Sequence, residues 1–172
     1  MRHTNRRTTL AVAFAAAVLP TSLRSAPLTH TDANKQAIRR IYDEAINSGR
    51  TGILADLIAP EFAGPDGTRG PAAYTANVSA LRAGFPDVRF TIEDIVAEGD
   101  RVAVRWTWTG THTGTFRGFA ASGKAVHDTG LVLYTLANGK VVAAIVETDR
   151  LGVLQQIGIV PADLTARRVE RR

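Results

Sequence analysis

The residues of this sequence that could carry chemistry are few, and they gather in its second half. The chain contains no cysteine, which excludes thiol catalysis and cysteine-ligated zinc. Of its four histidines, His3 and His30 fall near the N-terminus, which leaves His112 and His127 for a folded site. Two histidines do not make a multi-histidine metal centre, and no phosphate-binding loop or dinucleotide-binding glycine pattern occurs. We therefore expect neither a metal ion nor a cofactor.

Each remaining histidine has an ordinary interpretation beside a functional one. His112 lies in the threonine-rich stretch TGTHTGTF, where hydrogen bonding within the loop is expected and contact with a ligand at a pocket rim is the alternative. His127 directly precedes Asp128 and could take part in proton transfer. Strand alternation places His127 on an outer face, however, where a lone histidine is usually solvated.

Hydrophobic spacing predicts helices first and strands afterwards. Apolar residues recur at three- and four-residue intervals over 31–48, 51–59 and 71–83. The pattern then alternates, which predicts strands over 88–97, 101–114, 124–136 and 141–149, and a last short helix over 151–157. Helices followed by consecutive strands predict an α+β fold, in which N-terminal helices cover one face of a curved antiparallel sheet around a pocket.

The net charge of +5 comes from the two ends of the chain. Residues 1–26 hold four arginines and no acidic residue, and 167–172 hold four arginines and one glutamate. The intervening residues 27–166 carry 13 basic and 15 acidic groups, without a basic cluster interleaved with aromatic residues. Nucleic-acid binding is therefore not expected, and 167–172 is predicted to be a solvated basic tail.

The N-terminus has the pattern of a secretory signal peptide. The basic segment MRHTNRR precedes about a dozen apolar residues, and small residues follow up to Ala26. This apolar run is shorter than the roughly 20 residues of a membrane-spanning helix, so an uncleaved anchor is the less favoured alternative. We expect a signal peptide over 1–26, a secreted or periplasmic protein, and no stable membrane insertion after cleavage. The pair Arg6-Arg7 also permits the twin-arginine route.

Three separated motifs carry a resemblance to a known family: TGTHTGTF followed by SGK, the apolar strand LVLYTLANGKVV, and TDRLGVLQQIG. Over residues 31–160 the chain resembles the SnoaL-like polyketide cyclase or ester cyclase family, which has the nuclear transport factor 2-like fold. The resemblance implies one domain over 27–166, a cone-shaped sheet around a pocket, and a homodimer. It also implies cofactor-independent acid and base catalysis at a carbon next to carbonyl groups.

Two catalytic positions of that family are apolar in this chain. The motif D-x-x-G-x-x-x-Q-x-G begins at Asp149, so the resemblance places the family's acidic residue on Val146. It places the family's histidine on Val132. Because valine cannot transfer a proton, the family's mechanism does not carry over unchanged.

One carboxylate remains that the fold could direct into the pocket. If Val132 faces inward, as the resemblance implies, alternation puts Asp128 on the same face. Asp128 could then serve as a general base; the alternative is a solvated carboxylate at the polar edge of the strand. The expected ligand-binding wall consists of aromatic and apolar side chains with a histidine at the rim: Trp106, Trp108, Tyr134, Val132, Val146 and His112.

Two functions therefore stay open. The first is an exported cyclase-type enzyme that acts on a small apolar carbonyl compound, with Asp128 and His127 as catalytic candidates. The second is a non-catalytic binder of a small hydrophobic molecule, in which Val132 and Val146 mark the lost chemistry.

Three structural details are also predicted. An apolar row on the outer sheet face is expected to form the homodimer interface: Leu131, Leu133, Val141 and Ile145. Arg105 and Glu147 are expected to pair across strands on the outside. Asp149 is expected to cap the last helix.

Overall fold

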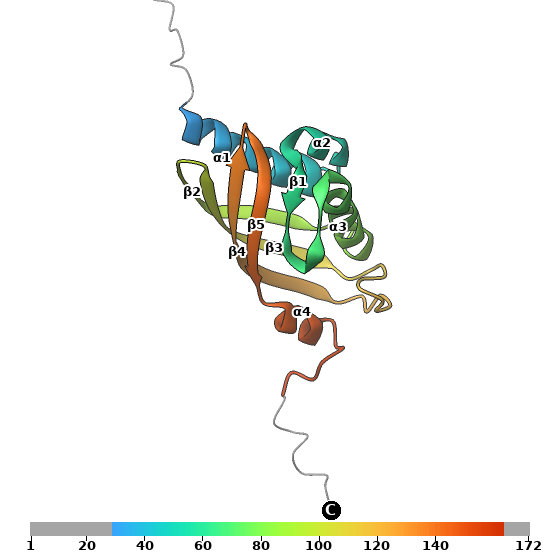
Figure 1. The fold of residues 1–172 in the computed structure, drawn as a ribbon. Coiled ribbons are helices and arrows are strands. Elements are labelled where there is room, and N and C mark those ends of the chain that lie inside the picture. Colours follow the sequence, from blue (N-terminus) through green and yellow to red (C-terminus); the bar gives the residue numbers. More distant parts are fainter. Residues whose placement is uncertain (1–28, 164–172) are drawn as a thin grey trace, which may run out of the picture.

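Five strands form one curved sheet in the computed structural model, which describes residues 29–163 (Figure 1). Their order is β1-β5-β4-β3-β2. Four consecutive strands pair antiparallel, and β1 joins the edge of the sheet parallel to β5. The bounds are β1 Ile58–Ala63, β2 Arg89–Glu98, β3 Arg101–Thr111, β4 Ala125–Ala137 and β5 Lys140–Thr148.

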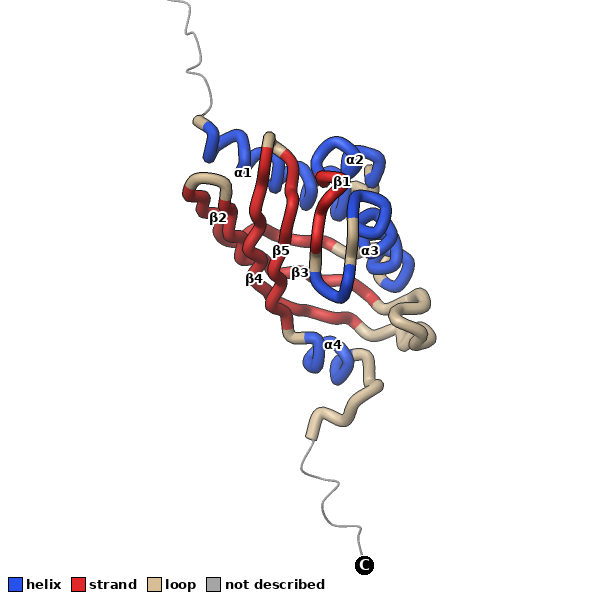
Figure 2. The backbone as a smooth tube through the Cα atoms, in the orientation of Figure 1, coloured by secondary structure: helices blue, strands red, loops and turns tan. Residues whose placement is uncertain are grey.

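Helices gather at the start of the chain and cover one face of this sheet, as the tube in Figure 2 shows. The main ones are α1 His30–Arg40, which continues as the π-helix η1 Ile41–Asn47, and α3 Gly70–Gly84. Shorter turns are η2 Thr51–Ile53, α2 Leu54–Leu57 and η3 Pro65–Gly67. The last helix, α4 Arg150–Gln156, lies at the end of the sheet away from α1 (Figure 1). The predicted α+β class and fold are confirmed.

The core lies between these helices and the inner sheet face. The helical spacing of α1 and η1 places three apolar side chains, Ile38, Ile41 and Ala45, in full burial. The predicted alternation of β3 is also present, since Val102, Val104, Trp106 and Trp108 are all buried. Burial of an aliphatic or aromatic side chain contributes about 1.5–3 kcal/mol, so this two-sided apolar contact is what holds the helices on the sheet.

The first strand corrects the sequence prediction, which extended a helix to Ala59 and continued it into a loop. Helical geometry ends earlier, because Ile58 adopts extended backbone angles of φ −107° and ψ 131°. Ile58 and Phe62 are buried, and the segment pairs with the open edge of β5. Pro60 has no amide hydrogen to donate, and an edge strand tolerates this. The apolar side chains of residues 51–59 follow a helical spacing. This spacing therefore led to a helix prediction where the edge strand β1 begins, at Ile58.

The outer ion pair also differs from the prediction. Arg105 does not pair with Glu147; its Nε lies 2.7 Å from Oδ2 of Asp94 on β2. A register shift between Ile92 and Asp94 places Asp94 opposite Arg105, whereas Glu147 lies opposite Leu131. Both partners of the observed pair are exposed, so it contributes less than about 1 kcal/mol.

The outer apolar row is shorter than predicted. Leu131 and Ile145 are 48% and 63% exposed, and Leu133 is half-buried between strands. Val141, in contrast, is completely buried, because the pairing of β4 with β5 shifts register between Thr135 and Leu136. That shift turns the start of β5 toward the core.

The predicted signal peptide, 1–26, and the basic run 167–172 lie outside the described residues. Within residues 29–163, no helix is both long and apolar enough to cross a lipid bilayer.

Candidate functional site

A cavity of about 640 Å³ lies between the inner sheet face, α3, α4 and the loop that joins β3 to β4. Its wall is largely apolar and aromatic, with a few polar side chains. The lining includes Tyr74, Trp108, Phe116, Arg117, Asp128, Tyr134, Val146, Thr148 and Arg150. This volume lies within the range of sites that hold small organic ligands.

Asp128 lines this cavity and is only 6% exposed. Its Oδ1 accepts a hydrogen bond from the backbone N–H of Thr129 at 2.8 Å. Its Oδ2 accepts two more, from the Thr148 hydroxyl at 2.6 Å and from the Trp108 indole N–H at 3.2 Å. A carboxylate has about four acceptor positions, so about one remains for a ligand or a proton.

Strand register explains why these side chains meet. Trp108 on β3 lies directly opposite Asp128 on β4. Thr148 lies opposite Gly130, which is two residues further along β4 on the same face. Three neighbouring strands therefore each contribute one side chain to the same small polar group on an otherwise apolar wall.

Val132 and Val146, the positions that the resemblance equates with catalytic residues, are direct partners across β4 and β5. Val146 lines the cavity, whereas Val132 is buried and does not line it. Asp128 lies four residues from Val132, or about 13 Å along the strand. Its carboxylate thus stands nearer to α4 than the family's positions do.

His127 does not reach the cavity. Its side chain is exposed on the opposite face of β4 from Asp128, as the alternation predicted. Its backbone instead exchanges two hydrogen bonds with the side-chain amide of Gln156 on α4, at 2.9 and 2.8 Å. This position fastens α4 to the sheet, and the geometry does not support His127 as a catalytic residue.

His112 is completely buried but is not part of the cavity lining. Its ring lies against Phe85 and Phe116 at centroid distances of 5.2 and 6.4 Å. Nδ1 accepts the backbone N–H of Ser122 at 3.2 Å and lies 3.1 Å from the Ser122 hydroxyl. His112 therefore ties the ends of the β3–β4 loop together, and ligand contact, the alternative considered for it, is not what the structure shows.

The two tryptophans have different positions. Trp108 lines the cavity, while Trp106 is buried behind it. The Trp106 ring occupies the space above Gly130, where a Cβ atom would collide with it and would lie 2.7 Å from the Glu147 carbonyl oxygen. Trp106 therefore supports the wall without forming part of it.

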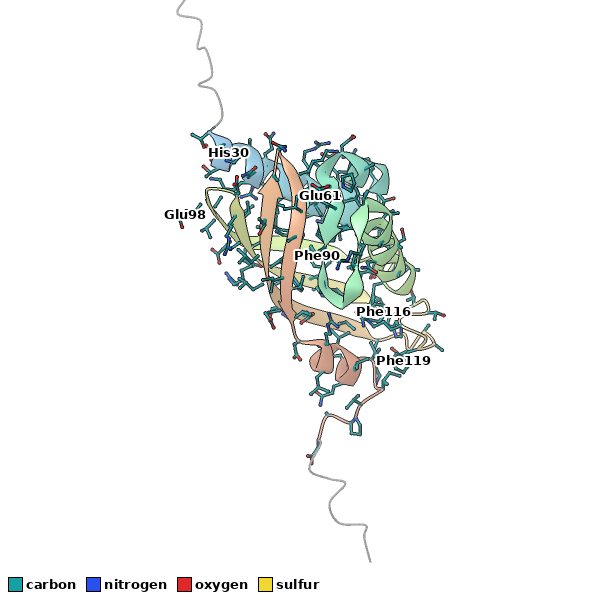
Figure 3. The ribbon with its side chains drawn as sticks, in the orientation of Figure 1. His30, Glu61, Phe90, Glu98, Phe116 and Phe119 are labelled. Carbon is teal, nitrogen blue, oxygen red and sulfur yellow. The ribbon has the colours of Figure 1, made fainter. Side chains whose placement is uncertain are left out.

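The β3–β4 loop contributes cavity residues that were not predicted from the sequence. Phe116 and Arg117 line the cavity, and the Arg117 guanidinium lies 5.7 Å from the centre of the Phe116 ring. Phe116 and Phe119 lie at the end of the molecule away from His30 (Figure 3). The loop is held against α3 by hydrogen bonds from the N–H groups of Thr113 and Gly114 to the Gly84 carbonyl, at 3.1 and 3.0 Å.

Three tyrosines meet at another part of the cavity, and only Tyr134 was expected there. Tyr74 and Tyr134 line the cavity, whereas Tyr42 is buried behind them. The hydroxyl oxygens of Tyr42 and Tyr134 are 2.9 Å apart, and Tyr74 neighbours Tyr134. Burial raises the pKa of each phenol well above its ordinary value and is the largest cause of the shift in all three. All three are therefore neutral near pH 7.

Residues 29–163 contain no group of three or more histidine, aspartate or glutamate side chains placed to hold a metal ion.

Comparison with known proteins gives consistent relatives. The family model for the SnoaL-like polyketide cyclases matches residues 36–157. Aklanonic acid methyl ester cyclase AcmA from Streptomyces galilaeus is 31% identical over 129 residues, which cover 71% of this chain and 88% of that protein. Among solved structures, TsrD from Streptomyces laurentii matches with a TM-score of 0.71 at 25% identity, over 78% of this chain and 100% of its own. A protein from Jannaschia sp. CCS1 assigned to the SnoaL-like polyketide cyclases has a TM-score of 0.70 at 28% identity, over 76% of this chain and 95% of its own.

Proposed function

The chain belongs to the SnoaL-like polyketide cyclase family, and on that premise we propose that it is a cyclase-type enzyme whose general base is Asp128. Its substrate in this proposal is a small, largely apolar carbonyl compound. The observation that carries the proposal is the placement of Asp128: among the described residues that line the cavity, it is the one carboxylate.

The proposed reaction is an intramolecular carbon–carbon bond formation. Asp128 takes a proton from a carbon next to carbonyl groups, which leaves an enolate. The enolate carbon attacks a second carbonyl carbon of the same molecule, and the new alkoxide oxygen takes the proton back from Asp128. The product is an isomer of the substrate, and the carboxylate is regenerated.

The surroundings of Asp128 support this role. Its three hydrogen-bond donors among residues 29–163 are all neutral groups, and together they hold the carboxylate in place. The Trp108 ring beside it offers a flat surface for a planar ligand. A base fixed next to such a surface meets the first requirement of general base catalysis, which is a defined position relative to the acidic carbon.

Replacement of the carboxylate tests the proposal. Asp128→Asn should lower kcat by about 10²- to 10⁴-fold, with aklanonic acid methyl ester, the compound named for the AcmA relative, as the first substrate to assay. Glu147→Gln is the matched control, because Glu147 is an exposed carboxylate on the outer face of β5 and should leave kcat unchanged. Circular dichroism checks that both variants are folded. Full activity of a folded Asp128→Asn protein would reject Asp128 as the base.

A non-catalytic binder is the second candidate, and a specific observation favours it. Val132 and Val146 face each other at the positions where the resemblance expects acid and base groups. A binder predicts that protein isolated from its source carries a hydrophobic molecule that is released unchanged. It also predicts that neither wild type nor Asp128→Asn consumes any carbonyl compound.

We also propose that the protein is exported and cleaved. The basic and apolar pattern of residues 1–26 supports this, and the small residues up to Ala26 supply the cleavage region. N-terminal sequencing of the protein from the periplasm or the culture medium should find a start close to residue 26. A chain that keeps Met1 in the cytoplasm would contradict export.

A further inference from the structure

We propose that Tyr74, backed by Tyr134 and Tyr42, donates a hydrogen bond to a carbonyl oxygen of the bound ligand. This inference rests on the proposed function, because it names the group of the carbonyl substrate that meets the tyrosine side of the cavity. It makes Tyr74 a specificity-determining residue for ketones over hydrocarbons of the same shape.

A count of hydrogens supports the proposal. Each phenol has one O–H donor, so the three hydroxyls bring three donor hydrogens. Among these described residues, the hydroxyls of Tyr42 and Tyr134 form a hydrogen bond at 2.9 Å, and Tyr74 neighbours Tyr134. At least one donor hydrogen is therefore left without an acceptor inside the row. It needs a partner from outside the triad.

The position of Tyr42 decides at which end that hydrogen lies. Tyr42 is 2% exposed and outside the cavity lining, and the described part of the chain gives its hydroxyl a single hydrogen-bond partner, Tyr134. A buried O–H that donates to nothing is costly, so Tyr42 donates to Tyr134. None of the hydrogen bonds of 3.5 Å or shorter among the described residues involves the Tyr74 hydroxyl, so its hydrogen is available. Since Tyr74 lines the cavity, a ligand can supply the acceptor.

Ring packing holds this donor in place. Tyr74 lies edge-on to Phe62 at a centroid distance of 5.4 Å, and Tyr134 lies edge-on to Tyr42 at 6.5 Å. Tyr42 belongs to the π-helix η1, a rare backbone form that is frequent at functional sites. The hydroxyl row is thus built from a helix, a strand and a second helix, and it is not a feature of one flexible segment.

The same geometry restricts the ligand. Asp128 and Tyr134 lie six residues apart on one face of β4, and both line the cavity together with Tyr74. The acidic carbon that meets Asp128 and the carbonyl oxygen that meets Tyr74 are therefore different parts of one ligand.

Binding of a matched pair of ligands tests the inference without any turnover. The probes are 9-fluorenone and fluorene, which share a planar three-ring frame and differ in a C=O against a CH₂ group. The chain has two tryptophans, both in or behind the cavity wall, so quenching of their fluorescence reports binding. The measured quantity is the ratio of the two dissociation constants, in wild type, Tyr74→Phe and Thr68→Val. Thr68→Val is the control, because it removes a cavity hydroxyl outside the triad.

We expect wild type and Thr68→Val to prefer fluorenone, and Tyr74→Phe to lose about fivefold of that preference. The infrared stretch of ¹³C-labelled fluorenone carbonyl should lie at lower frequency in wild type than in Tyr74→Phe, a difference that altered packing alone would not produce. An unchanged ratio in Tyr74→Phe, or no binding of either probe, would overturn the inference. Because these readouts are independent of Asp128, they can fail while the Asp128 test succeeds, and the reverse.

Discussion

The position of the Asp128 carboxylate depends on hydrogen bonds from two side chains on other strands, Thr148 and Trp108. Single substitutions can measure this dependence. Of these two hydrogen bonds to Oδ2, the one from the Thr148 hydroxyl is the shorter, at 2.6 Å, and the one from the Trp108 indole is 3.2 Å long. Thr148→Val keeps the shape of the side chain and removes this donor. Without it the carboxylate loses part of its orientation toward a substrate.

We therefore predict that Thr148→Val lowers kcat by about 10-fold and leaves the fold intact. Steady-state kinetics with the substrate used for Asp128→Asn provides the measurement. Thr135→Val is a suitable control, because Thr135 is also a threonine of the β4–β5 ladder but lies seven residues from Asp128 and outside the cavity lining. Equal activity of Thr148→Val and wild type would show that Thr148 does not position the base.

Part of this site could be predicted from single residues, and part could not. Alternation within one strand is enough to place Asp128 on the face of Val132 and His127 on the other. Thr148 and Tyr74 were not predicted as site residues. Thr148 reaches the site through the register of β4 with β5, and Tyr74 through the packing of α3 on the sheet, and no local sequence pattern specifies either. The burial of Trp106 behind the wall depends on the absence of a side chain at Gly130, a fact that only the folded neighbours reveal.

At the scale of elements, Gly130 is a position where β3, β4 and β5 pack closely together. A methyl group there would collide with the Trp106 ring and with the backbone of β5. We predict that Gly130→Ala destabilises the protein by about 1–3 kcal/mol, because the ring and the strand must both move.

Urea unfolding followed by tryptophan fluorescence measures this difference. Gly52→Ala is the control, since a Cβ at Gly52 meets nothing within 4 Å and should change stability little. A Gly130→Ala protein as stable as wild type would mean that the wall behind the cavity is looser than the structure indicates.

The elements themselves were largely predictable, with β1 as the instructive exception. Long periodic segments such as 71–83 and 101–114 carry enough turns or alternations to identify their type. Ile58–Ala63 is too short for that, and its partner, the edge of β5, lies about 80 residues away along the chain. The antiparallel strands β2 to β5 follow one another along the chain, and they were predicted. The parallel edge strand β1 is far from its partner in the sequence, and it was missed.

At the scale of the whole molecule, we propose that two copies associate through the outer sheet face. Leu131 and Ile145 are exposed there on adjacent strands, and exposed apolar side chains of this kind often mark an interface. Ile145→Lys should convert a dimer to a monomer without loss of stability. Leu151→Lys, an exposed apolar position on α4, should not.

Analytical ultracentrifugation over a range of protein concentrations distinguishes these cases. A wild-type protein with the mass of one chain at every concentration would contradict the dimer.

The tyrosine row has a further consequence for the stability of the whole domain at high pH. The pKa of each tyrosine is raised by burial, so the folded protein keeps protons that the unfolded chain loses above about pH 10. The stabilisation is therefore fully present below about pH 10 and is lost as the pH rises above it. We predict a lower free energy of unfolding at about pH 11 than at about pH 8, measured with urea.

The three residues of the row are also all the tyrosines of the chain, so phenolate absorbance reports on them alone. The phenolate absorbance should rise only when the protein unfolds. A rise near pH 10 in protein that circular dichroism shows to be folded would contradict the buried row.

The central claim is that Asp128 removes a proton from a carbon next to a carbonyl group, and isotope exchange tests it most directly. Aklanonic acid methyl ester is incubated with enzyme in deuterium oxide, and mass spectrometry measures deuterium at the acidic carbon of the substrate that remains. A fraction of the enolate returns to substrate, and it takes up a deuteron from Asp128 once the proton there has exchanged with the solvent. We therefore predict enzyme-dependent deuterium incorporation by wild type and by Glu147→Gln, and none above the uncatalysed rate by folded Asp128→Asn. Incorporation by Asp128→Asn at the wild-type rate would contradict it.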